Sequence, residues 1–374
     1  MCVVQMVRLR GFGLAPDANL MRSLPERLDA LGADVSAEFD AATVFYAGWQ
    51  TTAENRIALY GPPLRNLKAQ IRQTRFLSGS RTLSLRSVRD HYKFSKTTLA
   101  GSVERGEVQF ANPAFAGSLP VQHSMMGRAF AGKNVIYTMS KNNDLRWIVD
   151  WLTWHHKRHG ANAFVIVDNQ SSAYSADDLA DALRSVSGYD QGMVILAPFP
   201  FGPRRQAAAS LQYLQLAMHN MIFEQLLHRS RAVLFTDIDE LVFANADLSI
   251  FDAACDSWLG VVGIAGRWMH QPLGTPARHG AHVLLRPDDA ACAPKYCATP
   301  RGLARVFQPN VHGLRHIGRR RIADARFGFY HCRSVSTSWY YDRSDATGGR
   351  LTLDALAAAR MAETFGPMGQ GLPG

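Results

Sequence analysis

The feature that most constrains the fold is an alternation of short apolar runs with longer amphipathic runs between residues 134 and 243. Four apolar runs have the length and composition of buried strands, and they cover Asn134–Ser140, Ala163–Val167, Met193–Leu196 and Ala232–Phe235. Between them, helical spacing of apolar residues predicts helices over Leu145–Arg158, Ala176–Val186 and Gln206–His228. Since strand–helix–strand connections within a sheet are right-handed, this order predicts an α/β fold with a mostly parallel central sheet and helices on both faces.

The length of 374 residues allows one large domain or two ordinary ones. We predict three parts: an N-terminal accessory region of unclear fold over 1–132, the α/β domain over 133–345, and a C-terminal helix and tail over 346–374. The first part contains no motif that carries chemistry. The chemistry is therefore expected in the second part.

Carboxylates follow the last of the four predicted strands. Asp237, Asp239 and Glu240 come directly after the apolar residues Ala232–Phe235. Burying carboxylates there is costly unless a positive charge lies beside them. Strand alternation places Asp237 and Asp239 on the same side, and hard oxygen ligands suit Mg²⁺ or Mn²⁺, which also bind phosphate oxygens. We therefore predict a metal–phosphate site, with a polar turn of no function as the alternative.

Two earlier predicted strands also end in polar residues. Lys141-Asn142 follows the first strand and Asp168-Asn169 follows the second. In open parallel sheets, ligands bind in the crevice beyond the carboxyl ends of the strands. We therefore expect these residues to face the same crevice as the carboxylates, with Asp168 placed to hydrogen-bond a nucleoside.

Several common nucleotide enzymes and hydrolases are excluded by missing motifs. The sequence has no Gly-x-Gly-x-x-Gly after the first strand, no Gly-x-x-x-x-Gly-Lys-Ser/Thr loop and no Gly-x-Ser-x-Gly elbow. These absences argue against a dinucleotide dehydrogenase, a P-loop NTPase and an α/β-hydrolase.

A set of short segments occurs in order between Val135 and Tyr341. They are Lys141-Asn142, Trp151, His155, Gly160, Asp168-Asn169, Ser171, Phe235-Thr236-Asp237-Ile238-Asp239-Glu240, Pro294-Lys295-Tyr296, Asn310-Val311-His312 and Tyr330-His331-Cys332-Arg333 with Ser336. This set resembles the family 92 glycosyltransferases and their relatives in family 2. One motif departs from that pattern, because relatives often have Lys-Asn-Glu where this chain has Asn143. Nothing before Gly132 matches.

The resemblance implies a GT-A fold, a nucleotide-sugar donor, a divalent metal held by the Asp-x-Asp motif, and inversion at the anomeric carbon. We accordingly expect a metal-dependent glycosyltransferase of surface polysaccharide synthesis. Its favoured donor is a UDP-sugar, and its acceptor is a hydroxyl of a glycan or a lipid-linked molecule. Mn²⁺ or Mg²⁺ is the expected cofactor.

Roles can be assigned to individual residues as hypotheses. The predicted metal ligands are Asp237 and Asp239, with His331 and His312 as further ligands or phosphate contacts. The predicted donor-binding residues are Lys141, Asn142, Asp168, Asn169 and Lys295. The reaction also needs a base for the acceptor hydroxyl, and the sequence leaves four candidates open: Glu240, His270, Asp288 and Asp289. For Glu240, a supporting carboxylate is favoured over a direct metal ligand.

Charge and composition set the expected environment. A formal net charge of +10 favours anionic partners, and basic residues crowd the segments 65–105 and 315–326. No nucleic-acid-binding motif accompanies them, so nucleic acid is not an expected partner. Five irregularly spaced cysteines, no signal peptide and no membrane-spanning run indicate a cytoplasmic protein, with peripheral contact to the anionic inner face of the membrane.

Two other classes of function remain as alternatives. A nucleotidyltransferase also uses paired aspartates and a diphosphate. A degenerate transferase fold could instead serve as a non-catalytic basic scaffold.

Overall fold

The computed structural model describes residues 2–366 except 26–34, 36, 37, 52–54, 105, 204, 205, 336 and 338–349. The chain forms two compact units, each described here by itself. The first comprises Met1–Val7, Phe130–Ile195 and Arg229–Gly374, and the second comprises Arg8–Ala129 and Leu196–His228. Arg105, Ser336 and the tail beyond residue 366 lie outside the described residues. The three-part division at residues 132 and 345 stays a prediction.

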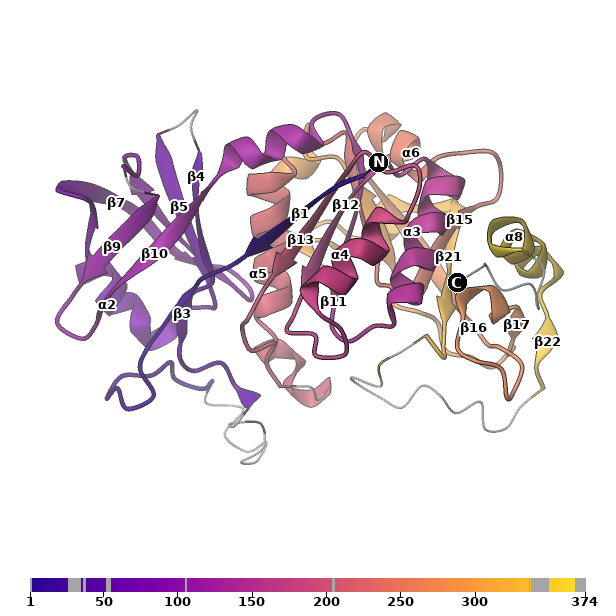
Figure 1. The fold of residues 1–374 in the computed structure, drawn as a ribbon, viewed down its shortest axis with the longest axis horizontal. Coiled ribbons are helices and arrows are strands. Elements are labelled where there is room, and N and C mark those ends of the chain that lie inside the picture. Colours follow the sequence, from indigo (N-terminus) through magenta and orange to yellow (C-terminus); the bar gives the residue numbers. More distant parts are fainter. Residues whose placement is uncertain are drawn as a thin grey trace. The chain divides into compact units, whose positions relative to one another are not determined.

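The first unit is built on one large sheet, which Figure 1 shows with its helices. In the described part of the chain this sheet has nine strands. In spatial order they are β1 (Val3–Arg8), β13 (Gln191–Leu196), β12 (Ala163–Asp168), β11 (Asn134–Ser140), β14 (Ala232–Phe235), β18 (Lys295–Ala298), β16 (Val261–Met269), β21 (Ala323–Cys332) and β15 (Glu240–Ala244). Every residue of β12 and of β14 is buried, so both faces of the sheet are covered here.

The chain changes direction across this sheet next to β11. Strand β11 pairs in parallel with β12 on one side, up to Ser140 opposite Asp168, and with β14 on the other, up to Tyr137 opposite Phe235. The chain therefore adds β12 and β13 on one side of β11 and then returns to the other side for β14. Such a switch point opens a crevice at the carboxyl ends of the two flanking strands. The change in strand order that such a crevice requires is thus present, and the crevice itself stays a prediction.

The expected parallel arrangement holds only for part of the sheet. Beyond β14, strand β18 runs antiparallel to both β14 and β16, and β15 runs antiparallel to β21, whereas β16 and β21 are parallel. The sheet is therefore mixed. The α/β class is correct, but the sequence predicted a more uniformly parallel sheet, because it does not show how strands late in the chain pair.

The helices of the first unit begin and end at residues with local signals. The side chain of Asp144 accepts a hydrogen bond from the N–H of Arg146 at the start of α3 (Leu145–His159), and Gly160, with φ 68°, ends it. Ser175 and Asp178 form a capping box at α4 (Ala176–Arg184). The remaining helices are α6 (Ile250–Asp256), α7 (Arg319–Ile322) and α8 (Ala355–Phe365).

Helix α3 holds β15, the strand that begins at Glu240. The N–H of Val242 donates to Nε2 of His155 over 3.2 Å, and the carbonyl of Val242 accepts from Nε2 of His159 (3.0 Å) and Nε1 of Trp154 (2.5 Å). Burial lowers the pKa of His159 to about 4, so its ring is neutral. Trp151 and Trp154 of α3 are fully buried, and side chains of this helix position the start of β15.

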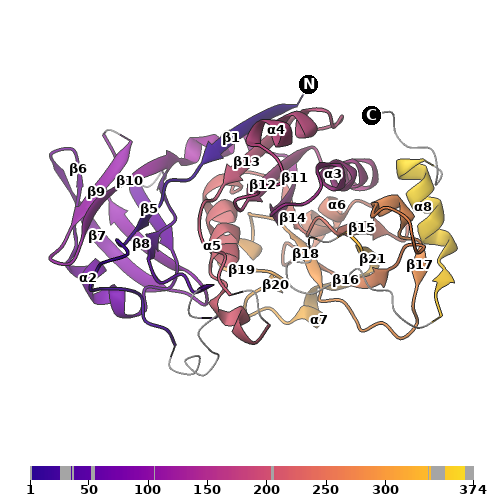
Figure 2. The same ribbon diagram turned by 60° about the horizontal axis from the view of Figure 1, so that its bottom comes forward.

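The second unit contains a closed barrel of seven strands in the residues described (Figure 2). In order around the barrel they are β10 (Ala116–His123), β4 (Ala47–Thr51), β5 (Arg56–Gly61), β8 (Ser95–Ala100), β7 (Arg81–Asp90), β6 (Arg75–Ser78) and β9 (Glu107–Ala111). Its interior is filled by apolar side chains, among them Ile57, Leu83, Leu99, Phe110 and Leu119. Closure of the barrel leaves no strand edge open in it.

The long helix predicted over Gln206–His228 is wrong in part. A 3₁₀ segment covers Gln206–Leu211, α5 covers Leu214–Met221, and a π-helical turn covers Ile222–Leu226. Seven of the eight residues of α5 are buried, which a one-sided apolar stripe does not predict. In the π turn, the consecutive residues Glu224 and Gln225 both bind the hydroxyl of Tyr60. This hydroxyl donates to Glu224 and accepts from Gln225.

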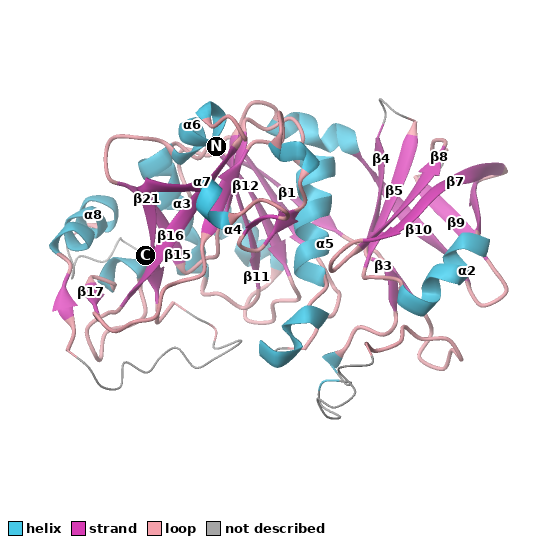
Figure 3. Cartoon of the chain, turned by 180° about the vertical axis from the view of Figure 1, so that it is seen from behind, coloured by secondary structure: helices cyan, strands magenta, loops and turns pink. Residues whose placement is uncertain are grey.

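The remaining elements are short. They are α2 (Lys68–Gln73), β2 (Phe12–Gly13), β3 (Thr43–Phe45), β17 (Leu284–Leu285), β19 (Pro309–Asn310), β20 (Gly313–Leu314) and β22 (Thr352–Leu353), and Figure 3 shows the secondary structure from behind. No helix among the described residues carries an apolar stretch that could cross a bilayer.

Candidate active site

The carboxylate cluster lies in the turn that joins β14 to β15, at the carboxyl end of β14. The N–H of Glu240 donates to the carbonyl of Asp237 over 3.1 Å. One carboxylate oxygen of Glu240, Oε2, accepts from the hydroxyl of Thr236 (3.1 Å) and from the N–H of Asp237 (2.8 Å). With only 2% of its side chain exposed, Glu240 holds this turn from inside.

A buried lysine neutralises the cluster. The ammonium of Lys295, at the start of β18, lies 2.5 Å from Oδ2 of Asp237 and 3.3 Å from Oε2 of Glu240, and its side chain is 3% exposed. Burial works to lower the pKa of Lys295, but the two carboxylates raise it above its ordinary value. Burial also raises the pKa of Glu240 to about 7 against the opposing charge of Lys295. Lys295 therefore supplies the positive charge that the carboxylates require.

Asp239 has a different partner. Its Oδ2 lies 3.0 Å from Nε2 of His331, which β21 places opposite Glu240 in the antiparallel pairing. The ring of Trp268 stacks on that of His331, with centroids 3.8 Å apart and planes 15° from parallel. The N–H of Cys332 donates to the carbonyl of Asp239 over 2.8 Å. Strand β21 thus fixes both the main chain and the side chain of Asp239.

These contacts decide which of the predicted metal ligands lie together. Asp239, Glu240 and His331 each present a ligand atom, and the three atoms lie within 4.8 Å of one another. Two carboxylates and one imidazole fit a first-row divalent ion such as Mn²⁺. Asp237 is not one of these three, and its Oδ2 accepts from the ammonium of Lys295 over 2.5 Å. The assignment of Asp237, Asp239, His331 and His312 as ligands stays a prediction.

His312 lies near Lys295 but is oriented by the main chain. Its Nδ1 is 3.1 Å from the carbonyl of Pro294, so this nitrogen carries the proton and donates. Burial, together with the positive charge of Lys295, lowers the pKa of His312 to about 4. The ring is therefore neutral at neutral pH with Nε2 unprotonated, which suits a metal ligand, whereas a hydrogen bond from Nε2 to a phosphate oxygen would need a proton there.

The polar residues after β11 and β12 form a hydrogen-bonded pair of loops. The side-chain oxygen of Asn142 accepts from the N–H groups of Ser172 (2.6 Å) and Ala173 (3.1 Å), while its own N–H donates to the hydroxyl of Ser171. Asn142 has φ 55°, a conformation that asparagine tolerates better than most residues. Half-buried Lys141 precedes it. Asn142 thus joins the two loops, a contact that its predicted donor-binding role did not include.

Asp168 and Asn169 lie at the end of β12 as predicted and are buried. The N–H of Asn169 donates to the carbonyl of Ser140 over 2.9 Å. Asp168 accepts from the N–H of Ser171 (3.0 Å) and from the hydroxyl of Tyr174 (3.3 Å). Each carboxylate oxygen of Asp168 keeps further acceptor capacity, so a nucleoside hydroxyl can still bind there.

Two of the four candidate bases form a pair. Nε2 of His270 lies 2.6 Å from Oδ2 of Asp289, and the His270 side chain is buried. His270 follows β16 directly, two residues after Trp268, so the pair lies at the same end of β16 as the Trp268–His331 stack. Asp288 is exposed beside this pair. Glu240 belongs to the carboxylate cluster.

No protein-family model matches the chain, and no curated protein does. Among solved structures, the mannosyltransferase Ktr4p from S. cerevisiae in complex with GDP is 12% identical over 38% of this chain and 41% of that chain, with a TM-score of 0.25. TarS from S. aureus is 14% identical over 45% of this chain and 47% of that chain, with a TM-score of 0.27. A nucleoside-diphosphate-sugar pyrophosphorylase from Vibrio cholerae is 10% identical over 44% of this chain and 72% of that chain, with a TM-score of 0.24.

The matched part spans less than half of Ktr4p and of TarS. Glycosyltransferases are thus among the structural neighbours, but similarity this low assigns neither a family nor an activity. The resemblance to family 92 stays a prediction.

Sequence reasoning missed residues that orient the cluster. Nε2 of buried His279 donates to the carbonyl of Ile238, between the two aspartates, over 2.8 Å. Nδ1 of His279 lies 3.6 Å from a carboxylate oxygen of buried Asp150. No sequence signal points to His279, since it lies 41 residues from Ile238 in an irregular segment. Thr236, by contrast, directly precedes Asp237, where a hydroxyl that caps a turn could have been expected.

Proposed function

We propose that this protein is a metal-dependent glycosyltransferase that moves a sugar from a nucleotide-sugar donor to a hydroxyl of a glycan or lipid-linked acceptor. One observation carries the proposal. At the switch point of the sheet, one turn carries three carboxylates. Buried Lys295 pairs with Asp237 and Glu240, and His331 pairs with Asp239. This arrangement offers both a cation site and a positive side chain to a diphosphate, which is what a nucleotide-sugar donor presents.

The donor binds across the carboxyl ends of β11, β12 and β14 in this proposal. Asp168 takes a ribose or base hydrogen bond, and Lys141 and Lys295 lie on the diphosphate side. Asp239 and His331, with Glu240 behind them, hold Mn²⁺ or Mg²⁺. When bound, that ion supplies positive charge to the departing diphosphate. Lys295 adds a second positive charge without leaving its carboxylate partners.

The acceptor hydroxyl needs a base, and Asp289 is favoured because it is both accessible and held in place by His270, whereas Asp288 lies exposed beside this pair. Glu240 is enclosed by Thr236 and Lys295, whereas 15% of the Asp289 side chain is exposed beside buried His270. In the step, the acceptor oxygen forms a bond to the anomeric carbon while the bond from that carbon to the diphosphate oxygen breaks. The acceptor proton passes to Asp289. A single displacement of this kind inverts the anomeric configuration.

A product assay on the purified protein tests the proposal. UDP- and GDP-sugars are supplied with Mn²⁺ and a panel of glycan acceptors, and the released product is identified. We expect release of the nucleoside diphosphate, and we expect the Asp239→Asn variant to lose at least about 100-fold in turnover because the cation site is broken. Asp247→Asn, which alters an exposed aspartate of the same unit, is the matched control and should keep full activity.

The outcomes separate the rival functions. Release of sugar 1-phosphate from these donors, or of pyrophosphate when UTP and a sugar 1-phosphate are supplied instead, would indicate nucleotidyl transfer. The absence of any Mn²⁺-dependent nucleotide-sugar binding in calorimetry would indicate a non-catalytic scaffold. Full turnover by Asp239→Asn would exclude the cation site placed here.

A further inference from the structure

A pocket lies at the end of the large sheet's strands that is opposite to the carboxylate cluster. Its volume is about 470 Å³, within the range of about 300–1,000 Å³ that small-molecule sites occupy. Gly132 precedes β11, Arg231 precedes β14, Gly260 precedes β16 and Thr299 follows β18, and all four line it. Since β11 and β14 are parallel, their amino ends meet at the edge away from Asp237. The pocket is therefore separate from the proposed active site.

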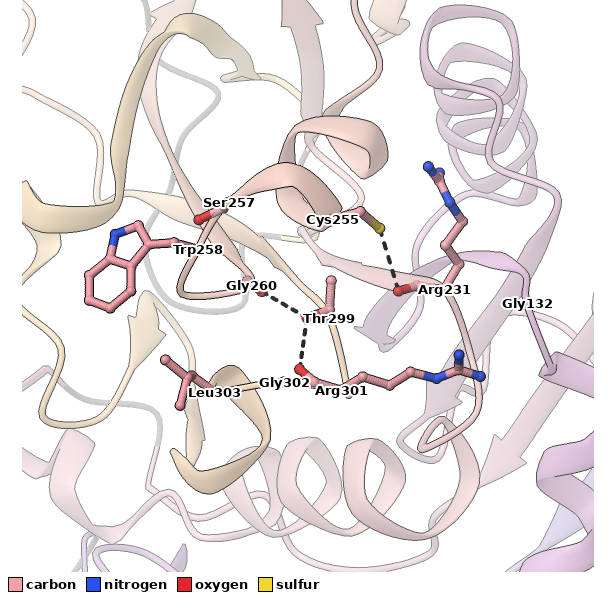
Figure 4. A pocket seen from close by; sticks show the side chains of 10 residues that line it. All are labelled: Gly132, Arg231, Cys255, Ser257, Trp258, Gly260, Thr299, Arg301, Gly302 and Leu303. Carbon is pink, nitrogen blue, oxygen red and sulfur yellow. Dashed lines mark hydrogen bonds between the residues drawn. The ribbon is translucent and has the colours of Figure 1, made fainter.

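One end of this pocket is cationic. Figure 4 shows the guanidinium groups of Arg231 and Arg301 on the side of Gly132. Arg231 pairs with exposed Asp252 over 2.6 Å, while Arg301 donates to the carbonyl of Arg229 over 3.2 Å. Within the described residues no carboxylate pairs with Arg301. Its remaining donors can therefore bind a carboxylate or phosphate in the forked geometry that guanidinium favours.

The other end is flat and apolar. Figure 4 places Trp258 and Leu303 away from the two guanidinium groups, on the far side of Thr299. The Trp258 side chain is 79% exposed and that of Leu303 is 50% exposed. A tryptophan so exposed contributes little to the stability of the core. Its indole face, at the border of the pocket, is a surface on which the C–H groups of a ligand ring can pack.

The main chain fixes the shape between these ends. The hydroxyl of Thr299 donates to the carbonyls of Gly260 (3.3 Å) and Arg301 (3.0 Å), which joins the two loops. Gly260 has φ 70° and Gly302 has φ 65°, so both turns adopt a backbone conformation that favours glycine. A side chain at Gly302 would meet no atom within 4 Å, so its turn borders open space.

We propose that this pocket binds an anionic saccharide, with a carboxylate or phosphate on Arg301 and a sugar ring on Trp258. The two ends match the two chemistries of such a ligand, a charged group and a ring whose C–H face is apolar. A membrane surface matches the pocket less well, because a lipid face needs apolar groups that project together, and here the loops joined by Thr299 lie between Trp258 and the guanidinium of Arg301. The inference rests on this pocket alone and not on the proposed transfer reaction.

Calorimetry with two matched oligosaccharides tests the inference. The anionic probe is hyaluronan tetrasaccharide, which contains glucuronate, and the neutral probe is tetra-N-acetylchitotetraose. We expect the anionic probe to bind and the neutral one to bind about tenfold more weakly or not at all. Trp258→Ala and Arg301→Gln should each weaken binding about tenfold. Arg305→Gln removes an exposed arginine that does not line the pocket and is the charge-matched control.

Several results would overturn the inference. These are no binding of the anionic probe, equal binding of the neutral probe, or an equal loss in Arg305→Gln. Binding to phosphatidylglycerol vesicles that depends on Trp258, without saccharide binding, would identify a membrane surface instead. Asp239→Asn should bind the anionic probe as the unaltered protein does, because the pocket is separate from the proposed active site. The binding result can therefore be interpreted even if the proposed transferase activity is not found.

Discussion

The central residue of the candidate site is Lys295. An ammonium with 3% of its side chain exposed would be unfavourable alone, but it lies between Asp237 and Glu240. Removing it would leave Glu240, whose pKa burial already raises to about 7, without its main compensating charge. Stability of the turn thus depends on this one side chain, and the proposed recognition of the donor diphosphate is next to it.

The choice of base can be tested at single residues. Asp289→Asn should lower kcat by about 10²–10⁴-fold and leave the donor KM nearly unchanged, because the base acts only on the acceptor hydroxyl. His270→Gln should have a smaller effect and should shift the pH profile of kcat, since His270 orients and polarises the carboxylate without touching the substrate. Steady-state kinetics across pH measures both.

Asp288→Asn is the matched control for this prediction. It alters the adjacent, exposed aspartate, which the sequence left as an equal candidate. A large loss of kcat in Asp288→Asn, together with normal kcat in Asp289→Asn, would show that Asp288 is the base and that Asp289 is not.

At the scale of elements, α3 and β15 determine where the carboxylates lie. Three side chains of α3 bind the two main-chain groups of Val242, two residues after Glu240. His159 also accepts from the N–H of Ile250 at the start of α6. One helix therefore ties together the strand after the carboxylate turn and the next helix. These contacts require a neutral His159, which donates through one ring nitrogen and accepts through the other.

This requirement predicts how stability depends on pH. The pKa of folded His159 is lowered to about 4, whereas the unfolded residue titrates near 6.5. As the pH falls between these values, the unfolded state takes up the proton first, so the free energy of unfolding decreases. The contribution of His159 should fall by about 2 kcal/mol between pH 7 and pH 4.5. Urea denaturation at the two pH values measures it.

The comparison is made between variants, because other groups titrate in the same range. His159→Gln should have a shallower pH dependence of unfolding than the unaltered protein. An unchanged slope in His159→Gln would contradict the neutral, buried state of this ring.

At the scale of the whole molecule, the net charge of +10 is carried partly by exposed arginines on regular elements. In the second unit, Arg81, Arg86 and Arg89 lie exposed on β7, and in the first unit Arg319, Arg320 and Arg321 are consecutive on α7. Both groups of arginines lie within the basic segments 65–105 and 315–326 of the sequence. A surface of this kind attracts anionic lipid by long-range electrostatics and needs no defined pocket.

Vesicle co-sedimentation tests this attraction. The protein should bind phosphatidylglycerol vesicles at low ionic strength, be released at about 0.5 M salt, and bind phosphatidylcholine vesicles weakly, because salt screens exposed charges. Replacing Arg319, Arg320 and Arg321 together by Gln should reduce the binding, and Trp258→Ala should not. Binding that ignores lipid charge would contradict peripheral contact through basic residues.

Sequence alone determined the elements whose signals are local. Strand β11 has its predicted bounds, Asn134–Ser140, and α3 extends its prediction by one residue, because apolar periodicity and capping involve only neighbours in the chain. The parallel pairing of β11 with β12 and β14 agrees with the predicted order. The helix predicted over Gln206–His228 was wrong in part, because apolar periodicity does not show where a helical segment changes from 3₁₀ to α to π hydrogen bonding.

Only the tertiary structure decided the partners. Lys295 meets Asp237 across 58 residues, His331 meets Asp239 across 92, and His270 meets Asp289 across 19. Each pairing depends on which strands lie side by side and in which direction they run. That arrangement follows from the packing of the whole core, so no local pattern of residues contains it.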